Sequence, residues 1–170
     1  METTSFSKDY KFSEASMNAW IKCLKEKLGA EEVIFVDNYN IQKSYWDCVA
    51  LFSGVQEPLR IEVKSRRIEF MKLYDRDHLR VIEIQGNNQS NDLGSSIYNG
   101  YADLMATGFF DGEYIQRPII FNKSAVGKIV YQACQNGKVQ IIENKYTDGK
   151  YNSKFALIPE KWIEPFSWEK

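Results

Sequence analysis

The chain has 170 residues, of which 44% are hydrophobic and 26% are charged, and its net charge is −1. This composition is typical of one globular domain with a sizeable core, and it excludes a disordered chain and a globally basic nucleic-acid binder. Three scattered cysteines and one histidine argue against a disulfide framework, a zinc site and a Ser-His-Asp triad. Without a signal segment or an apolar run of about 18 residues, we expect a cytoplasmic protein and no membrane partner.

The N-terminal part predicts a helix followed by short strands. Residues 13–29 place apolar side chains at helical spacing between Ser13, which suits an N-cap, and Gly29, which suits a stop. Further along, alternating or continuous apolar runs predict strands, and a segment with Gly and Pro predicts the turn of a β-hairpin. The expected strands are 33–36, 45–52 and 59–66, with the turn at 53–58.

The second half of the chain mixes both kinds of element. Residues 68–74 fit either a strand or a helix, and 97–110 are expected to be helical despite Gly100. The other expected elements are strands at 78–85, 113–121 and 138–146, a helix at 124–135, an exposed loop at 86–96, and an apolar C-terminal segment docked on the core. No repeat or linker divides the chain. We therefore expect a single α/β (α+β) domain over residues 1–170, with a central mixed β-sheet flanked by helices.

The hairpin gathers charged side chains on one face. A turn centred between Val55 and Gln56 places Asp47 opposite Lys64, with Glu62 as a diagonal neighbour on the same face. The opposite face is apolar and consists of Cys48, Ala50, Phe52, Leu59, Ile61 and Val63. Two carboxylates can hold Mg²⁺, which polarises a phosphate and activates water, and a neighbouring lysine can stabilise the developing charge. The same alternation also fits a half-buried strand with a solvated charged face.

The segments WDCVAL and IEVKSR share one pattern with the turn between them. The first strand carries an Asp, and the strand after the turn carries Glu-x-Lys. This pattern resembles the PD-(D/E)xK, or restriction endonuclease-like, superfamily. The resemblance covers residues 13 to about 85 and implies an αβββαβ core, with the C-terminal half unassigned. It also implies that Asp47 and Glu62 bind Mg²⁺ (or Mn²⁺) and that Lys64 completes the catalytic site.

Three further features bear on this resemblance. Members often add a Glu from the first helix, and Glu14 is the candidate by position. Trp46 stands where the superfamily pattern has Pro, which is a departure at a variable position. A second Glu-x-Lys, Glu143 and Lys145, has no Asp on an immediately preceding strand.

The resemblance implies a metal-dependent DNA endonuclease or exonuclease, in restriction, repair, recombination or phage metabolism. Basic residues near the motif suit phosphate contacts, with Arg60, Arg66 and Arg67 as the nucleic-acid-binding candidates. The wider basic group also includes Lys72, Arg76 and Arg80. The expected partner is double-stranded or branched DNA, and a homodimer stays open. The alternative is a non-catalytic binding or structural module in which Glu62 and Lys64 form an ordinary cross-strand charge pair, and the arginines protect a strand edge.

Overall fold

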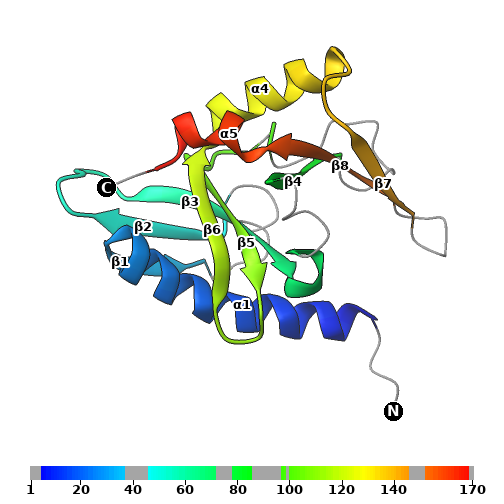
Figure 1. The fold of residues 1–170 in the computed structure, drawn as a ribbon. Helices are drawn as coiled ribbons and strands as arrows, with labels where there is room; N and C mark the ends of the chain where they lie inside the picture. The colour runs from blue at the N-terminus through cyan, green and yellow to red at the C-terminus, as the bar shows by residue number, and fades with distance from the viewer. Residues whose placement is uncertain are drawn as a thin grey trace.

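The computed structural model is a mixed α+β structure with two β-sheets (Figure 1). It describes residues 5–36, 46–71, 78–85, 97–98, 100–145 and 152–168. The predicted loop at 86–96, and Lys72 and Arg76 of the basic group, lie outside these residues. Within the described segments, no helix is both long and apolar enough to span a bilayer.

A five-stranded mixed sheet forms the centre of the fold. Its strands are β1 (Ala30–Phe35), β2 (Cys48–Phe52), β3 (Leu59–Arg67), β5 (Leu104–Phe110) and β6 (Ile115–Asn122), and they lie side by side in that order. β1, β2 and β3 are antiparallel neighbours, β5 runs parallel to β3, and β6 is antiparallel to β5. The expected mixed central sheet is therefore confirmed.

A second, three-stranded sheet was not predicted. It consists of β4 (Leu79–Gln85), β8 (Asn152–Pro159) and β7 (Ile141–Lys145), all antiparallel, with β8 in the middle. The C-terminal apolar segment thus provides a central strand, followed by α5 (Glu160–Ile163) and the 3-10 turn η3 (Glu164–Phe166). Residues 68–74, which fitted either element, contain the 3-10 turn η1 (Ile68–Phe70).

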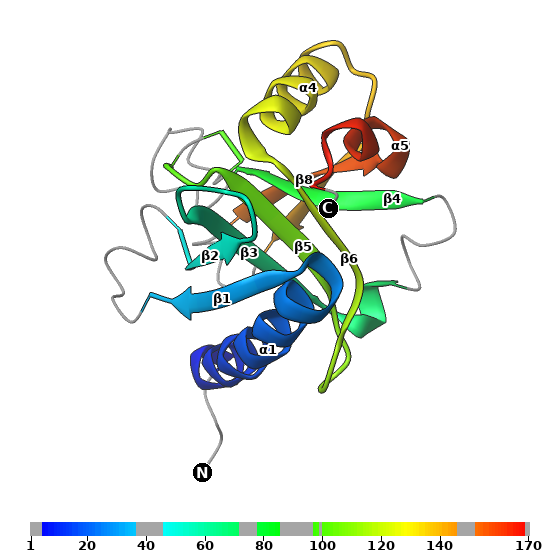
Figure 2. The same ribbon diagram turned by 90° about the vertical axis from the view of Figure 1, so that its left-hand side faces the viewer.

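Helices cover both faces of the five-stranded sheet. Helix α1 (Ser5–Leu28) lies against one face, and α4 (Lys123–Gln135) lies on the opposite side with the second sheet, as Figure 2 shows. Trp20 and Leu24 of α1 are fully buried in the first apolar cluster. The second cluster joins the two sheets through Phe121 and Ile158, with Val126 of α4. Burial of such side chains supplies most of the stabilisation of the fold.

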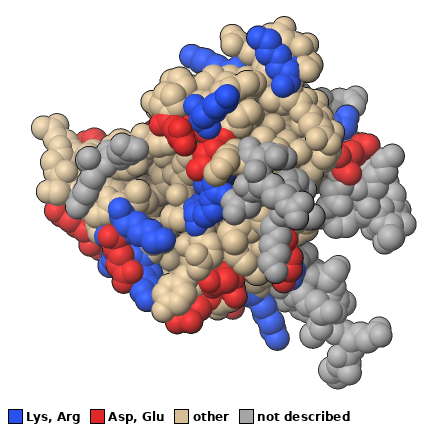
Figure 3. Space-filling model, in the orientation of Figure 1, with Lys and Arg blue, Asp and Glu red and all other residues tan. Residues whose placement is uncertain are grey.

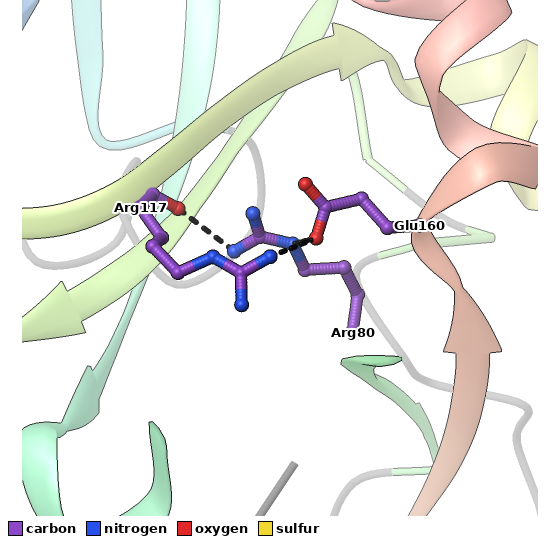
Figure 4. Close-up of polar contacts among 3 residues, drawn as sticks. All are labelled: Arg80, Arg117 and Glu160. Atoms are coloured by element: carbon purple, nitrogen blue, oxygen red, sulfur yellow. Dashed lines mark hydrogen bonds and ion pairs between the residues drawn. The ribbon is translucent and has the colours of Figure 1, made fainter. Parts of the chain in front are cut away.

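A buried ion-pair cluster also joins the two sheets (Figure 4). Glu160 Oε2 accepts hydrogen bonds from Arg80 Nε at 3.0 Å and from Arg117 Nη2 at 2.7 Å, and Arg80 Nη1 donates to the Arg117 carbonyl at 2.8 Å. The Arg80 side chain is 5% exposed, so its charge depends on these partners. Arg80 is therefore a structural residue of β4 and does not belong to a basic surface.

The helix at the N-terminus is longer than predicted. It begins at Ser5 rather than near Ser13, and its apolar stripe extends to Phe12, whose ring packs edge-on against Phe110 with centroids 5.6 Å apart. The predicted stop is confirmed, because the helix ends at Leu28 and Gly29 follows with φ of 70°.

The helix predicted at 97–110 is wrong, because Leu104–Phe110 is strand β5. Every residue of β5 is buried, since the strand lies between β3 and β6 and is covered on both faces. A strand buried on both faces loses the alternation that would distinguish it from a helix. A Cβ on Gly108 would collide with the Ile115 side chain, so this strand position requires glycine.

The β2–β3 hairpin is paired two residues away from the predicted register. Cys48 pairs with Ile61, and this register, continued by one position, would set Asp47 opposite Glu62 rather than opposite Lys64. The chain reverses earlier than predicted, at a turn in which Val55 N donates to the Phe52 carbonyl at 3.1 Å. A shift of two residues leaves every side chain on its predicted face. Asp47, Glu62 and Lys64 accordingly lie close enough for their charges to interact.

Candidate active site

Asp47 lies at the end of the hairpin, directly before β2. Its Oδ2 accepts a hydrogen bond from the backbone N–H of Val63 at 2.6 Å, and its own N–H donates to the Ile61 carbonyl at 3.0 Å. The β2–β3 pairing ends at Cys48, so the Asp47 carboxylate occupies the next donor of β3. This contact holds the half-buried carboxylate in place and leaves its second oxygen for another partner.

Glu62 lies between two lysines. Its Oε1 is 3.0 Å from Lys64 Nζ, and its Oε2 is 3.1 Å from Lys123 Nζ. Glu62 is 8% exposed, and the side chain of Lys123 is only 4% exposed. Lys123 is the first residue of α4, so the helix on this face of the sheet delivers a second ammonium group to the carboxylate.

Lys123 was missed by the sequence analysis. It lies 61 residues beyond Glu62 in the chain, and no local pattern marks it. Its burial at the start of a helix appears only when β5 and β6 place α4 beside β3. In the sequence it reads as one more surface lysine.

The charges of the group perturb one another. Burial raises the pKa of Asp47 above its usual value, and the charge of Glu62 adds to this, although Lys64 and the Val63 N–H oppose it. For Lys64, burial alone would lower the pKa, but the carboxylates of Glu62, Asp47 and Glu83 outweigh burial and raise it. Lys64 is therefore an ammonium ion at neutral pH, which acts as a hydrogen-bond donor and not as a base.

Asp47→Asn is expected to stabilise the fold at neutral pH. A carboxyl with a raised pKa binds its proton more tightly in the folded than in the unfolded state, so stability falls as pH rises through that pKa. Asn retains an oxygen for the Val63 N–H and has no charge to bury, so the gain should be about 0.5–2 kcal/mol, the usual range for one stabilising substitution. Melting temperatures at neutral and acidic pH measure this gain. The difference should vanish in acid, and an equal difference at both pH values would contradict the electrostatic cause.

The carboxylates fit a metal ion by their chemistry. Asp47 and Glu62 offer the anionic oxygens that Mg²⁺ and Mn²⁺ prefer, and they are close enough for Glu62 to raise the pKa of Asp47. In the part of the chain that the structure describes, no group of three or more Asp, Glu, His or Cys side chains is arranged to hold a metal ion. Two carboxylates with several retained waters are a usual mode for Mg²⁺. Because both Glu62 oxygens contact lysines, a bound ion must compete with these ion pairs.

A hollow of about 240 Å³ opens beside Asp47 and Lys64. Phe12 and Ser16 of α1 form its opposite wall. Glu14 is exposed on α1 and is not among the described residues that line this hollow, so the structure does not bring it together with the other predicted site residues. The helix wall near Asp47 is formed by aromatic and hydroxyl side chains instead.

The three predicted phosphate-binding arginines already have partners. The guanidinium of Arg60 makes two hydrogen bonds to the Asp103 carboxylate, at 3.0 and 2.8 Å, and the Arg60 side chain is 40% exposed. The guanidinium of Arg66 lies 4.7 Å from the ring centroid of Phe155, and that of Arg67 lies 5.0 Å from the ring centroid of Phe12. These contacts give each arginine a structural role that sequence alone did not indicate.

Positive and negative side chains alternate over the molecular surface shown in Figure 3. This face carries no broad field of one sign, which agrees with the net charge of −1. Any attraction for phosphates must therefore be local.

Comparison of the chain with protein-family models, curated proteins and solved structures found no match.

Proposed function

We propose that this chain is a Mg²⁺- or Mn²⁺-dependent nuclease that hydrolyses phosphodiester bonds in DNA. The observation that carries the proposal is the meeting of Asp47, Glu62 and Lys64 at the end of the β2–β3 hairpin, where their charges interact. Two carboxylates and a protonated lysine are groups that suit metal-dependent phosphodiester hydrolysis. The hollow lined by Asp47 and Lys64 supports access of a phosphate to these two residues.

The order of the elements also supports the proposal. Helix α1 precedes three antiparallel neighbours, β1 to β3, and β5 follows beside β3 in the same sheet. This order agrees with the start and the fourth strand of an αβββαβ core. The helix of that core between its third and fourth strands is not found among the described residues of this connection, which contains η1 and β4.

Each residue of the group has a distinct role in the proposed reaction. Asp47 and Glu62 would hold the ion, which when bound polarises the scissile phosphate and activates water. The Lys64 ammonium group donates hydrogen bonds where negative charge develops on the phosphate oxygens. The Val63 N–H fixes the Asp47 carboxylate, so that one ligand is oriented before the ion arrives.

One observation favours a second candidate, a non-catalytic binding or structural module. Lys64 and Lys123 together satisfy both oxygens of Glu62 without any metal. In such a module the group would only stabilise the contact between β3 and α4. Metal binding and nuclease assays distinguish the two candidates, because the module requires neither activity.

Glu62→Gln is expected to weaken Mn²⁺ binding strongly while preserving the fold. Gln keeps the volume of Glu62 but removes the anionic ligand that hard cations prefer. Calorimetric titration of the parent and the variant with Mn²⁺ measures the change. Glu143→Gln is the matched control, because Glu143 opens the second Glu-x-Lys on an exposed position of β7. Equal Mn²⁺ affinity of parent and Glu62→Gln would remove Glu62 from the metal site.

The catalytic part of the proposal is tested on the parent protein. Plasmid, linear and branched DNA are incubated with Mg²⁺ or Mn²⁺, and cleavage is followed on gels. Cleavage that requires the ion supports the nuclease. If no DNA substrate is cleaved with either ion, the non-catalytic module is favoured.

A further inference from the structure

A groove of about 370 Å³ lies next to the candidate active site, on the side of α4. One wall is formed by Ile97 and Tyr98, and the other wall is formed by α4. Lys123 belongs to the lining of this groove and also contacts Glu62 at 3.1 Å. The groove therefore begins where the proposed active site ends, with a single lysine between them.

The groove has the side chains that suit a nucleotide. Lys128 provides an exposed positive charge, whereas the Lys123 ammonium group is held by Glu62, and none of the described residues that line the groove is acidic. Tyr98 and Tyr131 form an edge-on pair with ring centroids 6.1 Å apart, and Tyr131 is 46% exposed. Lysines beside accessible aromatic rings combine contacts for a phosphate with a surface on which a base can stack.

The walls of the groove are held at a fixed distance. Gly127 of α4 approaches the Ile97 backbone so closely that a Cβ at this position would lie 2.7 Å from the Ile97 carbonyl oxygen. Any other residue would push the two walls apart. The groove is therefore set by backbone packing and does not depend on the conformation of long side chains.

We propose that this groove binds one nucleotide of the DNA strand, next to the phosphate that is hydrolysed. This inference rests on the proposed nuclease function. It adds a binding site for the part of the substrate strand next to the hydrolysed phosphate. Tyr131, supported edge-on by Tyr98, stacks with the base. Lys128 contacts a backbone phosphate of this nucleotide. Lys123 Nζ stays with Glu62 and lies at the boundary between the groove and the carboxylates.

The test uses variants of exposed residues, which should leave the fold intact. Tyr131→Ala removes the stacking surface, Tyr131→Phe retains it, and Lys128→Met removes the charge. Lys138→Met is the matched charge control, because Lys138 is exposed and outside the groove. Anisotropy of a fluorescein-labelled DNA duplex with a single-stranded extension is measured in Ca²⁺ at several salt concentrations. Calorimetric titration with Mn²⁺ is run on the same proteins.

We expect Tyr131→Ala to weaken DNA binding by on the order of 10-fold, and Tyr131→Phe to bind as the parent does. Lys128→Met should reduce the slope of log affinity against log salt by about 1, and Lys138→Met should leave it unchanged. Mn²⁺ affinity should stay at the parent value in all four variants, because none of them alters a metal ligand. If both Tyr131→Ala and Lys128→Met bind DNA as the parent does, the groove is not a nucleotide-binding site, and the nuclease proposal is unaffected. A parent protein that binds neither Mn²⁺ nor DNA would overturn both.

Discussion

Lys64→Met is expected to reduce DNA hydrolysis by about 10²–10³-fold or more, while the protein still folds and binds Mn²⁺. Met has roughly the volume and flexibility of the lysine stem, so the packing of β3 is retained. Glu62 keeps its contact with Lys123 at 3.1 Å and is not left as an isolated buried charge. What disappears is the ammonium group that the surrounding carboxylates hold in its protonated form.

Rates on plasmid, linear and branched DNA are compared for the parent, Lys64→Met and Lys138→Met, with a gel shift in Ca²⁺ for binding. The control removes a lysine of equal charge from an exposed position outside the site. If the parent cuts and Lys64→Met cuts equally well, Lys64 is not catalytic. Mn²⁺ affinity should be unchanged or slightly higher in Lys64→Met, since a positive charge next to both proposed ligands is gone.

Cys48→Asp is expected to destabilise the fold by several kcal/mol, roughly 2–5. Cys48 is 0% exposed and faces the first apolar cluster, where burial raises the pKa of its thiol to about 12. A carboxylate there meets the same unfavourable environment, and it also lies next to the charge of Asp47. Urea unfolding of the parent and the variant measures the loss.

Val49→Asp is the matched control for this substitution. Val49 is the next residue of β2, points to the opposite face and is only partly buried. The loss of stability should therefore be clearly smaller than for Cys48→Asp. Equal stability of Cys48→Asp and the parent would mean that the two faces of the hairpin are exchanged, with Asp47 in the core and the proposed site lost.

The elements that the sequence predicted well are those in which apolar and charged residues alternate. β3 alternates because its apolar side chains pack in the first cluster under α1, while Glu62 and Lys64 form an ion pair on the other face, and the hairpin faces followed from this alternation. β5 carries no such signal, because both of its faces are buried. The sequence did not predict the second sheet for another reason. The strand β8 is an ordinary apolar run, and its pairing with β4 is a long-range contact that no local pattern encodes.

The candidate site was predictable only where its residues are close in sequence. Asp47, Glu62 and Lys64 belong to one hairpin, so their common face follows from strand geometry, and even a register error of two residues preserved it. Lys123 comes from a distant helix and depends on the tertiary structure. For the three arginines, the sequence shows the charge but not the partner. It cannot show, for example, that Arg60 forms an ion pair with Asp103.

The central position of β8 has a consequence for the order in which the protein folds during synthesis. All strands of the five-stranded sheet have been synthesised once Asn122 is made, whereas β4 and β7 must wait for residues 152–159 before either can pair. Until then, the nascent chain carries Ile82 and Ile84 of β4 without their final neighbours. Pairing across such a long stretch of chain is slow, and an apolar strand that waits is open to association with other chains. The time that the ribosome needs to synthesise residues 86–159 therefore sets the shortest time for which β4 is exposed.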